Sequence, residues 1–200
     1  MENSRRLMVL GAALSLACGA EGVSLAQDEA PRVPLAALDA TVSSATANPD
    51  YCLPVKIWLF ASSQLESQLM TLINQRRAAG ANCGGSVKLP VPPLATDNAL
   101  TCAAHLHAKD MFTNVFLSHV GSTGSTPLKR ITSAGFTPLS YAGEVIAAGY
   151  GTPEDVVAGW MASAEDCATL MSPTFTHANA GFGTVSGTTY GFWAVALGRP

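Results

Sequence analysis

The order in which helical and strand-like patterns follow one another constrains the fold of this chain more than any other feature. Leu65, Leu69, Leu72 and Ile73 repeat at i, i+4, i+7 and i+8, the stripe of an amphipathic helix. Three later segments have helical patterns: one begins at Thr96 or Asp97, one covers 127–134 and one begins at Thr152. Strand patterns occur at 141–150, 180–185 and 190–197. This order predicts an α+β domain in which helices cover an antiparallel sheet.

The second predicted helix carries two histidines in different settings. His105 and Lys109 point away from its apolar face, so we expect His105 outside the core. His107 is on the apolar face and is interpreted as a core histidine. That face is formed by Leu100, Ala104, His107, Ala108 and Met111.

The predicted strands differ in how they alternate. Segment 190–197 is apolar on both sides, which predicts a central strand, and Ser186-Gly187 before it is a hairpin signal. In segment 141–150, Glu144 is on the same side as Ile146 and Ala148. Segment 82–93 is so rich in glycine and proline that we expect no regular element there.

The first residues are typical of an export signal. Arg5 and Arg6 precede an apolar run at 7–17, and Ser24-Leu25-Ala26 fits the small-x-small cleavage pattern. We therefore predict a signal peptide over 1–26 and a secreted or periplasmic protein. A short buried helix, a twin-arginine signal and a lipoprotein signal at Cys18 stay open as alternatives.

The predicted domain occupies residues 64–200, after a flexible tether and N-terminal extension at 27–63. Residues 27–50 are mainly alanine, threonine, serine, aspartate and proline without periodicity. Segment 51–60 is more apolar, but Pro54 argues against a regular helix. We expect this segment to pack on the domain, pinned through Cys52.

The charge of the chain excludes some partners. A formal net charge of −3 with 12% charged residues gives no basic footprint for nucleic acid or an anionic membrane surface. No apolar run reaches the length of a membrane-spanning helix, so no integral membrane segment is predicted. We expect a monomer.

The cysteines point to disulfides. Removal of Cys18 with the leader leaves four of the five cysteines, namely Cys52, Cys83, Cys102 and Cys167. An even number in an exported protein suggests two bridges, for which three connectivities exist. The absence of a C-x-x-C spacing disfavours a structural zinc site.

Three side chains are candidates for chemistry. His119 borders a loop of small residues, Glu144 is a carboxylate within an apolar strand, and Asp166 follows the helix that begins at Thr152. Together they could hold a divalent ion, or His119 and Glu144 could form a catalytic pair for proton transfer. The alternatives are a solvated His119, a structural Glu144 and an Asp166 that only caps a helix.

Several segments, in this order, resemble the bacterial branch of the CAP superfamily, which includes cysteine-rich secretory proteins, antigen 5 and pathogenesis-related proteins. The matching segments are 72–77 (LINQRR), 107–111 with 118–119 (HAKDM and SH), 143–146 (GEVI), 160–163 (WMAS) and 172–176 (SPTFT). The resemblance implies a three-layer α-β-α sandwich with a surface cavity that binds metal in many members.

The resemblance also implies site residues and disulfides. His119 and Glu144 match the first cavity histidine and the first glutamate, whereas Asp166 stands where bacterial members have the second histidine. Because zinc prefers nitrogen and sulfur ligands, this change leaves open zinc, calcium, magnesium, manganese or no metal. The resemblance further implies a Cys83–Cys167 bridge, with Cys52–Cys102 as the second.

Two functions follow from the resemblance. The first is an extracellular or envelope binding module whose ligand is a lipid, a sterol or an extracellular protein. The second is a metal-assisted hydrolase of peptide or cell-envelope substrates, with His119 or Glu144 as the base. We favour the binding module, because a domain that only binds does not need the complete set of metal ligands that the replacement of the second histidine by Asp166 disrupts. Whether the protein is an enzyme stays open.

Overall fold

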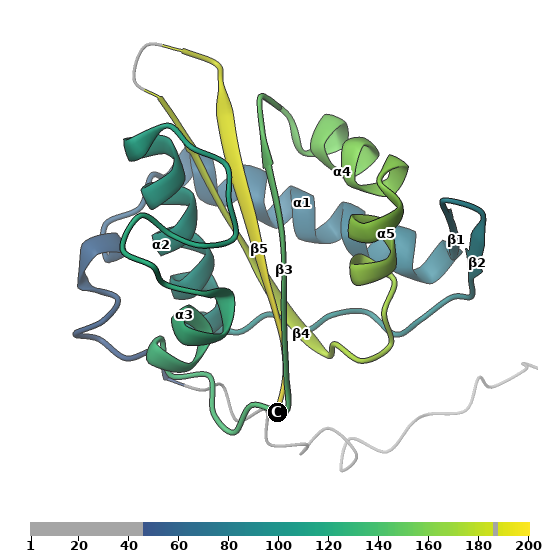
Figure 1. The fold of residues 1–200 in the computed structure, drawn as a ribbon, viewed down its shortest axis with the longest axis horizontal. Helices are drawn as coiled ribbons and strands as arrows, with labels where there is room; N and C mark the ends of the chain where they lie inside the picture. Colours follow the sequence, from purple (N-terminus) through teal and green to yellow (C-terminus); the bar gives the residue numbers. More distant parts are fainter. Residues whose placement is uncertain (1–45, 186–187) are drawn as a thin grey trace, which may run out of the picture. The chain divides into compact units, whose positions relative to one another are not determined.

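A computed structural model describes residues 46–185 and 188–200, whose elements follow the predicted order (Figure 1). They are η2 (Leu53–Val55), α1 (Phe60–Ala79), β1 (Ala81–Cys83), β2 (Ser86–Lys88), α2 (Asn98–Asn114), α3 (Pro127–Ser133), β3 (Tyr141–Ala148), α4 (Pro153–Ala162), α5 (Ala164–Leu170), β4 (His177–Thr184) and β5 (Gly191–Arg199). The predicted signal peptide and the tether up to residue 45 lie outside the described residues, as do Ser186 and Gly187 of the predicted hairpin.

The main sheet is antiparallel in the order β3-β5-β4, so β5 is the central strand, as predicted. Alternate β5 side chains divide the core. Trp193, Val195 and Leu197 pack with α1, α4 and α5, whereas Phe192, Ala194 and Ala196 pack with α2 and α3. Figure 1 shows α2 and α3 on one side of the sheet and α4 and α5 on the other. The predicted three-layer α-β-α sandwich is confirmed.

Helix α2 lies directly on strand β4 because glycine leaves room for it. A Cβ at Gly181 would come within 2.5 Å of the Ala104 carbonyl oxygen. The close contact fixes the position of α2, which carries both His105 and His107.

The helix starts agree with the predicted caps. Asp97 accepts hydrogen bonds from the backbone N–H groups of Ala99 and Leu100 at 2.7 and 3.2 Å, and Thr152 caps α4. Helix α1 begins at Phe60, slightly before the predicted domain boundary at residue 64.

The prediction of no regular element at 82–93 was wrong. Strands β1 and β2 form a short antiparallel hairpin. Its turn uses Gly84 and Gly85 at φ 58° and 93°, and the Gly85 N–H donates to Asn82 Oδ1 at 2.8 Å. Glycine and asparagine therefore form a hairpin turn here.

Both disulfides implied by the resemblance are present. Cys52 is bonded to Cys102, and Cys83 is bonded to Cys167. The first joins the N-terminal extension to α2, and the second joins β1 to α5. The described extension is therefore tied to the domain, as expected for Cys52.

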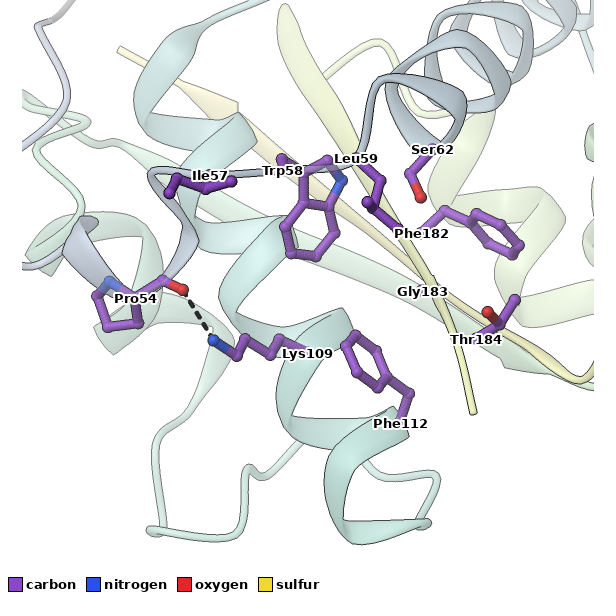
Figure 2. A pocket seen from close by; sticks show the side chains of 10 residues that line it. All are labelled: Pro54, Ile57, Trp58, Leu59, Ser62, Lys109, Phe112, Phe182, Gly183 and Thr184. Carbon is purple, nitrogen blue, oxygen red and sulfur yellow. Dashed lines mark hydrogen bonds between the residues drawn. The ribbon is translucent and has the colours of Figure 1, made fainter. Parts of the chain in front are cut away.

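The described part of the extension, residues 46–59, packs along α2 and α3. The Asn48 N–H donates to the Ala134 carbonyl at 2.8 Å, and Lys109 Nζ donates to the Pro54 carbonyl at 2.8 Å. Between the extension, α2 and β4 lies a cleft of about 440 Å³ (Figure 2). In the described residues, no helix combines the length and hydropathy needed to cross a membrane.

Candidate functional site

Glu144 lies in the middle of β3, on the face that α2 and α3 cover. It pairs with Ala196 of β5, and its side chain is only 3% exposed. The neighbouring Val145 packs on the opposite face, with α1 and α4. The alternation predicted for this strand is therefore confirmed, and it places a carboxylate inside the sandwich.

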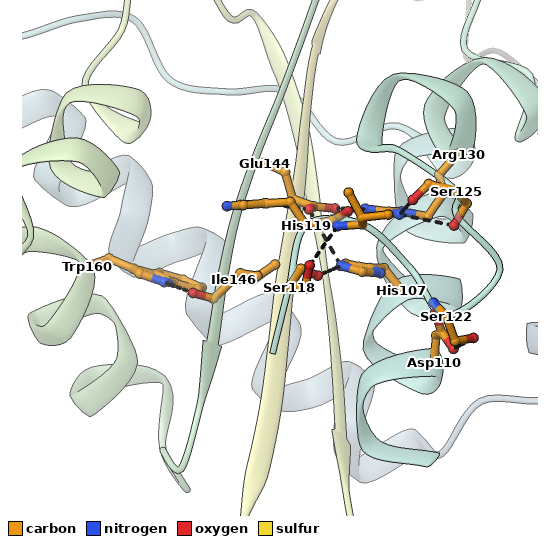
Figure 3. A network of polar contacts seen from close by, with 11 residues as sticks. His107, Asp110, Ser118, His119, Ser122, Ser125, Arg130, Glu144, Ile146 and Trp160 are labelled. Carbon is orange, nitrogen blue, oxygen red and sulfur yellow. Dashed lines mark hydrogen bonds and ion pairs between the residues drawn. The ribbon is translucent and has the colours of Figure 1, made fainter. Parts of the chain in front are cut away.

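Both oxygens of Glu144 are engaged by nitrogen groups of the protein (Figure 3). Oε1 lies 2.8 Å from His119 Nδ1, and Oε2 accepts a hydrogen bond from Arg130 at 2.7 Å. His107 Nε2 is a further 3.6 Å contact of Oε1. A buried carboxylate is costly unless paired and hydrogen-bonded, and Glu144 meets both conditions.

Arg130 of α3 completes the group formed with Glu144, His107 and His119, which we call the Glu144 centre. Arg130 was not among the site residues predicted from the sequence. Its side chain is 3% exposed. Besides Glu144 it donates to the carbonyls of Ser125 and His119 at 2.7 and 2.9 Å. The signal that could have found it was the buried Glu144, which needs a cation within reach, and Arg130 belongs to the adjoining predicted helix.

His119 is the accessible member of the centre, with a side chain that is 53% exposed. The hydrogen bond to Glu144 raises the pKa of His119 above its ordinary value, against an opposing effect of burial. The charge of Asp166 adds to the rise in this pKa, and the charge of Arg130 opposes it. The centre therefore favours the protonated imidazole, as expected for a histidine beside a carboxylate.

His107 is fully buried, which confirms its assignment to the core. Its Nε2 lies 2.8 Å from the Ser118 carbonyl, so this nitrogen carries the hydrogen. Burial lowers the pKa of His107 below its ordinary value. The residue is thus a neutral imidazole that supports the loop leading to His119.

Asp166 acts on His119 only through its charge and makes no direct contact with it. It belongs to the first turn of α5, where its N–H donates to the hydroxyl of the N-cap residue Ser163 at 3.3 Å. In the described part of the chain its side chain makes no hydrogen bond or ion pair with His119 or Glu144. Nor do these residues include any group of three or more His, Cys, Asp or Glu side chains placed to hold a metal ion.

Residues 70–197 match the family model described as the cysteine-rich secretory protein family, CAP. The chain belongs to this family. An uncharacterized protein of Bacillus subtilis, YkwD, is 32% identical to the CAP chain over 122 residues, which are 60% of this chain and 43% of YkwD. The chain thus spans less than half of that relative.

Solved structures show the same CAP fold. An extracellular SCP-domain protein from Bacillus anthracis has a TM-score of 0.56 and 25% identity, over 70% of this chain and 41% of that one. An outer surface protein from Borrelia burgdorferi has a TM-score of 0.53 and 16% identity, over 78% of this chain and 98% of that one. The first is a longer protein, of which this chain matches less than half.

This CAP domain holds a second Glu–His pair that the sequence analysis missed. His105, expected to point away from the core, is only 7% exposed, so that prediction was wrong. Its Nε2 lies 2.9 Å from Glu66 of α1, and Trp58 of the extension stacks on its ring. The apolar pattern of α2 alone could not indicate that the extension and α1 cover its other side.

Proposed function

We propose that this CAP protein is an extracellular or envelope binding module. The observation that carries the proposal is the state of Glu144, whose two oxygens are already paired with His119 and Arg130. A guanidinium 2.7 Å from the carboxylate competes with any divalent cation for it. With Asp166 in place of a second histidine, the donor set suits metal catalysis poorly.

The cleft beside the extension offers a place for the apolar part of a ligand. Its lining includes the apolar side chains of Ile57, Leu59 and Phe112 and the charged side chain of Lys109 (Figure 2). Ile57 and Leu59 are 93% and 73% exposed, an unusual exposure for adjoining large apolar side chains. A volume of about 440 Å³ is within the range of ligand pockets in proteins.

The charge near this cleft indicates which amphiphile fits. Lys109 lies in the wall, and the described residues that line the cleft include no carboxylate. Opposite charge favours an anionic headgroup there. We therefore assign the cleft to a single-chain anionic amphiphile such as a fatty acid, rather than to a sterol or a protein.

Export is part of the proposal. Two disulfides are typical of an oxidising compartment, and residues 1–26 have the pattern of a signal peptide. A protein purified from the culture medium or periplasm should begin at Gln27.

Titration with a fluorescent long-chain fatty acid tests the binding role. We expect saturable binding that a Phe112→Ser variant weakens at least about tenfold, since it removes an aromatic wall. Lys109→Met should weaken binding of the acid but not of its methyl ester. The control is Leu128→Ser, a change of another exposed apolar residue, on α3. Equal affinity of Phe112→Ser and the control would contradict the assignment of the cleft.

The alternative is a hydrolase, favoured by one observation. The half-exposed His119 is hydrogen-bonded to a buried carboxylate at 2.8 Å, an arrangement that suits proton transfer to or from a substrate. Hydrolysis of peptide or envelope material that is lost in His119→Ala and retained in Phe112→Ser would favour this function over the binding module.

A further inference from the structure

Helix α2 presents histidines on two opposite sides. His105 and His107 are two residues apart, which corresponds to a rotation of about 200° around the helix. His107 therefore faces Glu144, whereas His105 faces Glu66 of α1. The Glu66–His105 pair takes no part in the centre around Glu144.

The position of His105 is fixed on two sides. Glu66 Oε2 lies 2.9 Å from its Nε2, and the Trp58 indole stacks on its ring at a centroid distance of 4.0 Å. Glu66 Oε1 is itself held by the N–H groups of Trp58 and Phe182, both at 2.7 Å. Because Nε2 faces the carboxylate, Nδ1 is the ring nitrogen left to contact a ligand.

Nδ1 of His105 has no hydrogen-bond partner in the described part of the chain, yet the residue lines a cleft of about 400 Å³ between α1 and α2. A similar pair in enzymes consists of a carboxylate that orients one imidazole nitrogen while the other nitrogen meets the ligand. Here the oriented nitrogen is Nε2 and the unpaired one is Nδ1. The imidazole is thus prepared to accept a hydrogen bond from a bound molecule.

The wall of this cleft is rich in hydroxyl and amide groups. Its polar lining, apart from Glu66 and His105, consists of Ser63, Ser67, Thr71, Asn74, Thr96, Thr101 and Asn179. Among the described residues, the hydroxyls of Ser67 and Thr96 make no hydrogen bond. In the part of the chain that the structure describes, the lining of this cleft contains no lysine or arginine that would favour an anion.

A second cleft adjoins the first at His105 and adds an aromatic wall. It measures about 550 Å³, and His105 and Trp58 line it together with the oppositely charged Asp50 and Lys56. The combination of free hydroxyls, an unpaired imidazole nitrogen and an indole suits a molecule with many hydroxyls and apolar C–H faces, since each face of such a molecule finds a matching partner.

We infer that the cleft between α1 and α2, with the Glu66–His105 pair in its wall, is a binding site for a neutral glycan. In this site His105 Nδ1 accepts a hydrogen bond from a sugar hydroxyl, and Ser67 and Thr96 contact further hydroxyls. Glu66 is a positioning residue that holds the imidazole. The site shares Trp58 with the wall of the fatty-acid cleft and shares no residue with the centre around Glu144.

Titration followed by NMR tests this inference. The probes are three neutral oligosaccharides, maltotriose, mannotriose and triacetylchitotriose, each added to the secreted protein at millimolar concentration. With at least one of them we expect saturable shifts of the His105 imidazole and of the amides of residues 66–71 and 96–101. Absence of saturable shifts with all three, or shifts confined to other surfaces, would overturn the inference.

Variants separate a ligand contact from a structural role. Ser67→Ala and Thr96→Val change unpaired hydroxyls and should each weaken binding roughly three- to tenfold without changing the melting temperature, as expected for one hydrogen bond. His105→Gln should weaken it further. The matched control is Thr113→Val, which changes an exposed hydroxyl near the C-terminal end of α2, outside the cleft, and should leave glycan affinity unchanged. Undiminished affinity in both hydroxyl variants would contradict the site.

Discussion

Glu144 illustrates how one buried residue determines its neighbours. A carboxylate that is 3% exposed needs a cation and hydrogen bonds, and Arg130 and His119 supply them. Glu144 was predicted as a site residue because a charge within an apolar strand is conspicuous, and His119 because it borders a loop of small residues. Arg130 was missed because an arginine in a short polar helix has the same pattern whether it points to solvent or inwards.

The pKa of His119 provides the first prediction. The hydrogen bond to Glu144 raises this pKa, so Glu144→Gln should lower it towards the ordinary value near 6.5. Because the folded-state pKa is the higher one, the stability from this contact is fully present below about pH 6.5 and is lost as pH rises through the folded-state pKa. NMR titration of the imidazole measures the change, and an unchanged pKa in the variant would contradict the assignment.

The Arg130–Glu144 ion pair provides the second prediction. Arg130→Met leaves the carboxylate buried beside His119 alone, and should lower the free energy of unfolding by about 3–5 kcal/mol. The double variant Arg130→Met/Glu144→Leu removes both charges and should recover much of that loss. Urea denaturation gives both values. A loss below about 1 kcal/mol in the single variant would mean that the pair is not buried in solution.

At the scale of elements, Asn74 and Arg77 of α1 fix the neighbouring loops through hydrogen bonds to their backbone. Asn74 exchanges two hydrogen bonds with the backbone of Leu94. Arg77, 1% exposed, donates to the carbonyls of Pro92, Leu170 and Ser172. The sequence analysis recognised these residues through the family resemblance, and their contacts give the physical reason for that pattern.

Replacement of Arg77 tests how much these hydrogen bonds contribute to the stability of the domain. Arg77→Ala leaves buried carbonyls from two loops without a donor and should cost about 3 kcal/mol or more. Arg76→Ala, the matched control, changes an exposed neighbour and should alter stability by less than about 0.5 kcal/mol. Thermal or urea unfolding distinguishes the two, and equal effects would contradict the role of Arg77.

The Cys52–Cys102 bridge fixes the N-terminal extension to α2. A Cys52→Ser/Cys102→Ser variant should lose about 2–4 kcal/mol of stability and expose residues 46–59 to proteolysis. A Cys83→Ser/Cys167→Ser variant should also lose stability, but its extension should stay protected. Limited proteolysis with mass spectrometry checks this, and equal protection of the extension in both variants would be contrary to the prediction.

The elements themselves were largely predictable, for identifiable reasons. The caps Asp97 and Thr152 and the apolar segment 190–197 carry local signals that the structure retains. The β1–β2 hairpin was not predicted, because its turn depends on one asparagine side chain and two glycines with positive φ. The burial of His105 was not predictable from α2, because it results from contacts with Glu66 and Trp58 elsewhere in the chain.

At the scale of the whole molecule, the sandwich separates three surfaces around α2. The Glu144 centre lies between α2, α3 and the sheet, the apolar cleft lies against the extension, and the hydroxyl-rich cleft lies towards α1. Trp58 lines the apolar cleft and stacks on His105 of the hydroxyl-rich cleft, so a change in one of these two surfaces affects the other. The Glu144 centre shares no residue with either cleft.

We propose that Glu144 belongs to a charge network with His119 and Arg130 rather than to a metal centre. Calorimetric titration with zinc and manganese, together with the metal content of the secreted protein, tests it most directly. We expect no stoichiometric metal and no difference between the wild-type protein and a His119→Ala/Glu144→Ala variant. One equivalent of metal that is lost in the variant would contradict it.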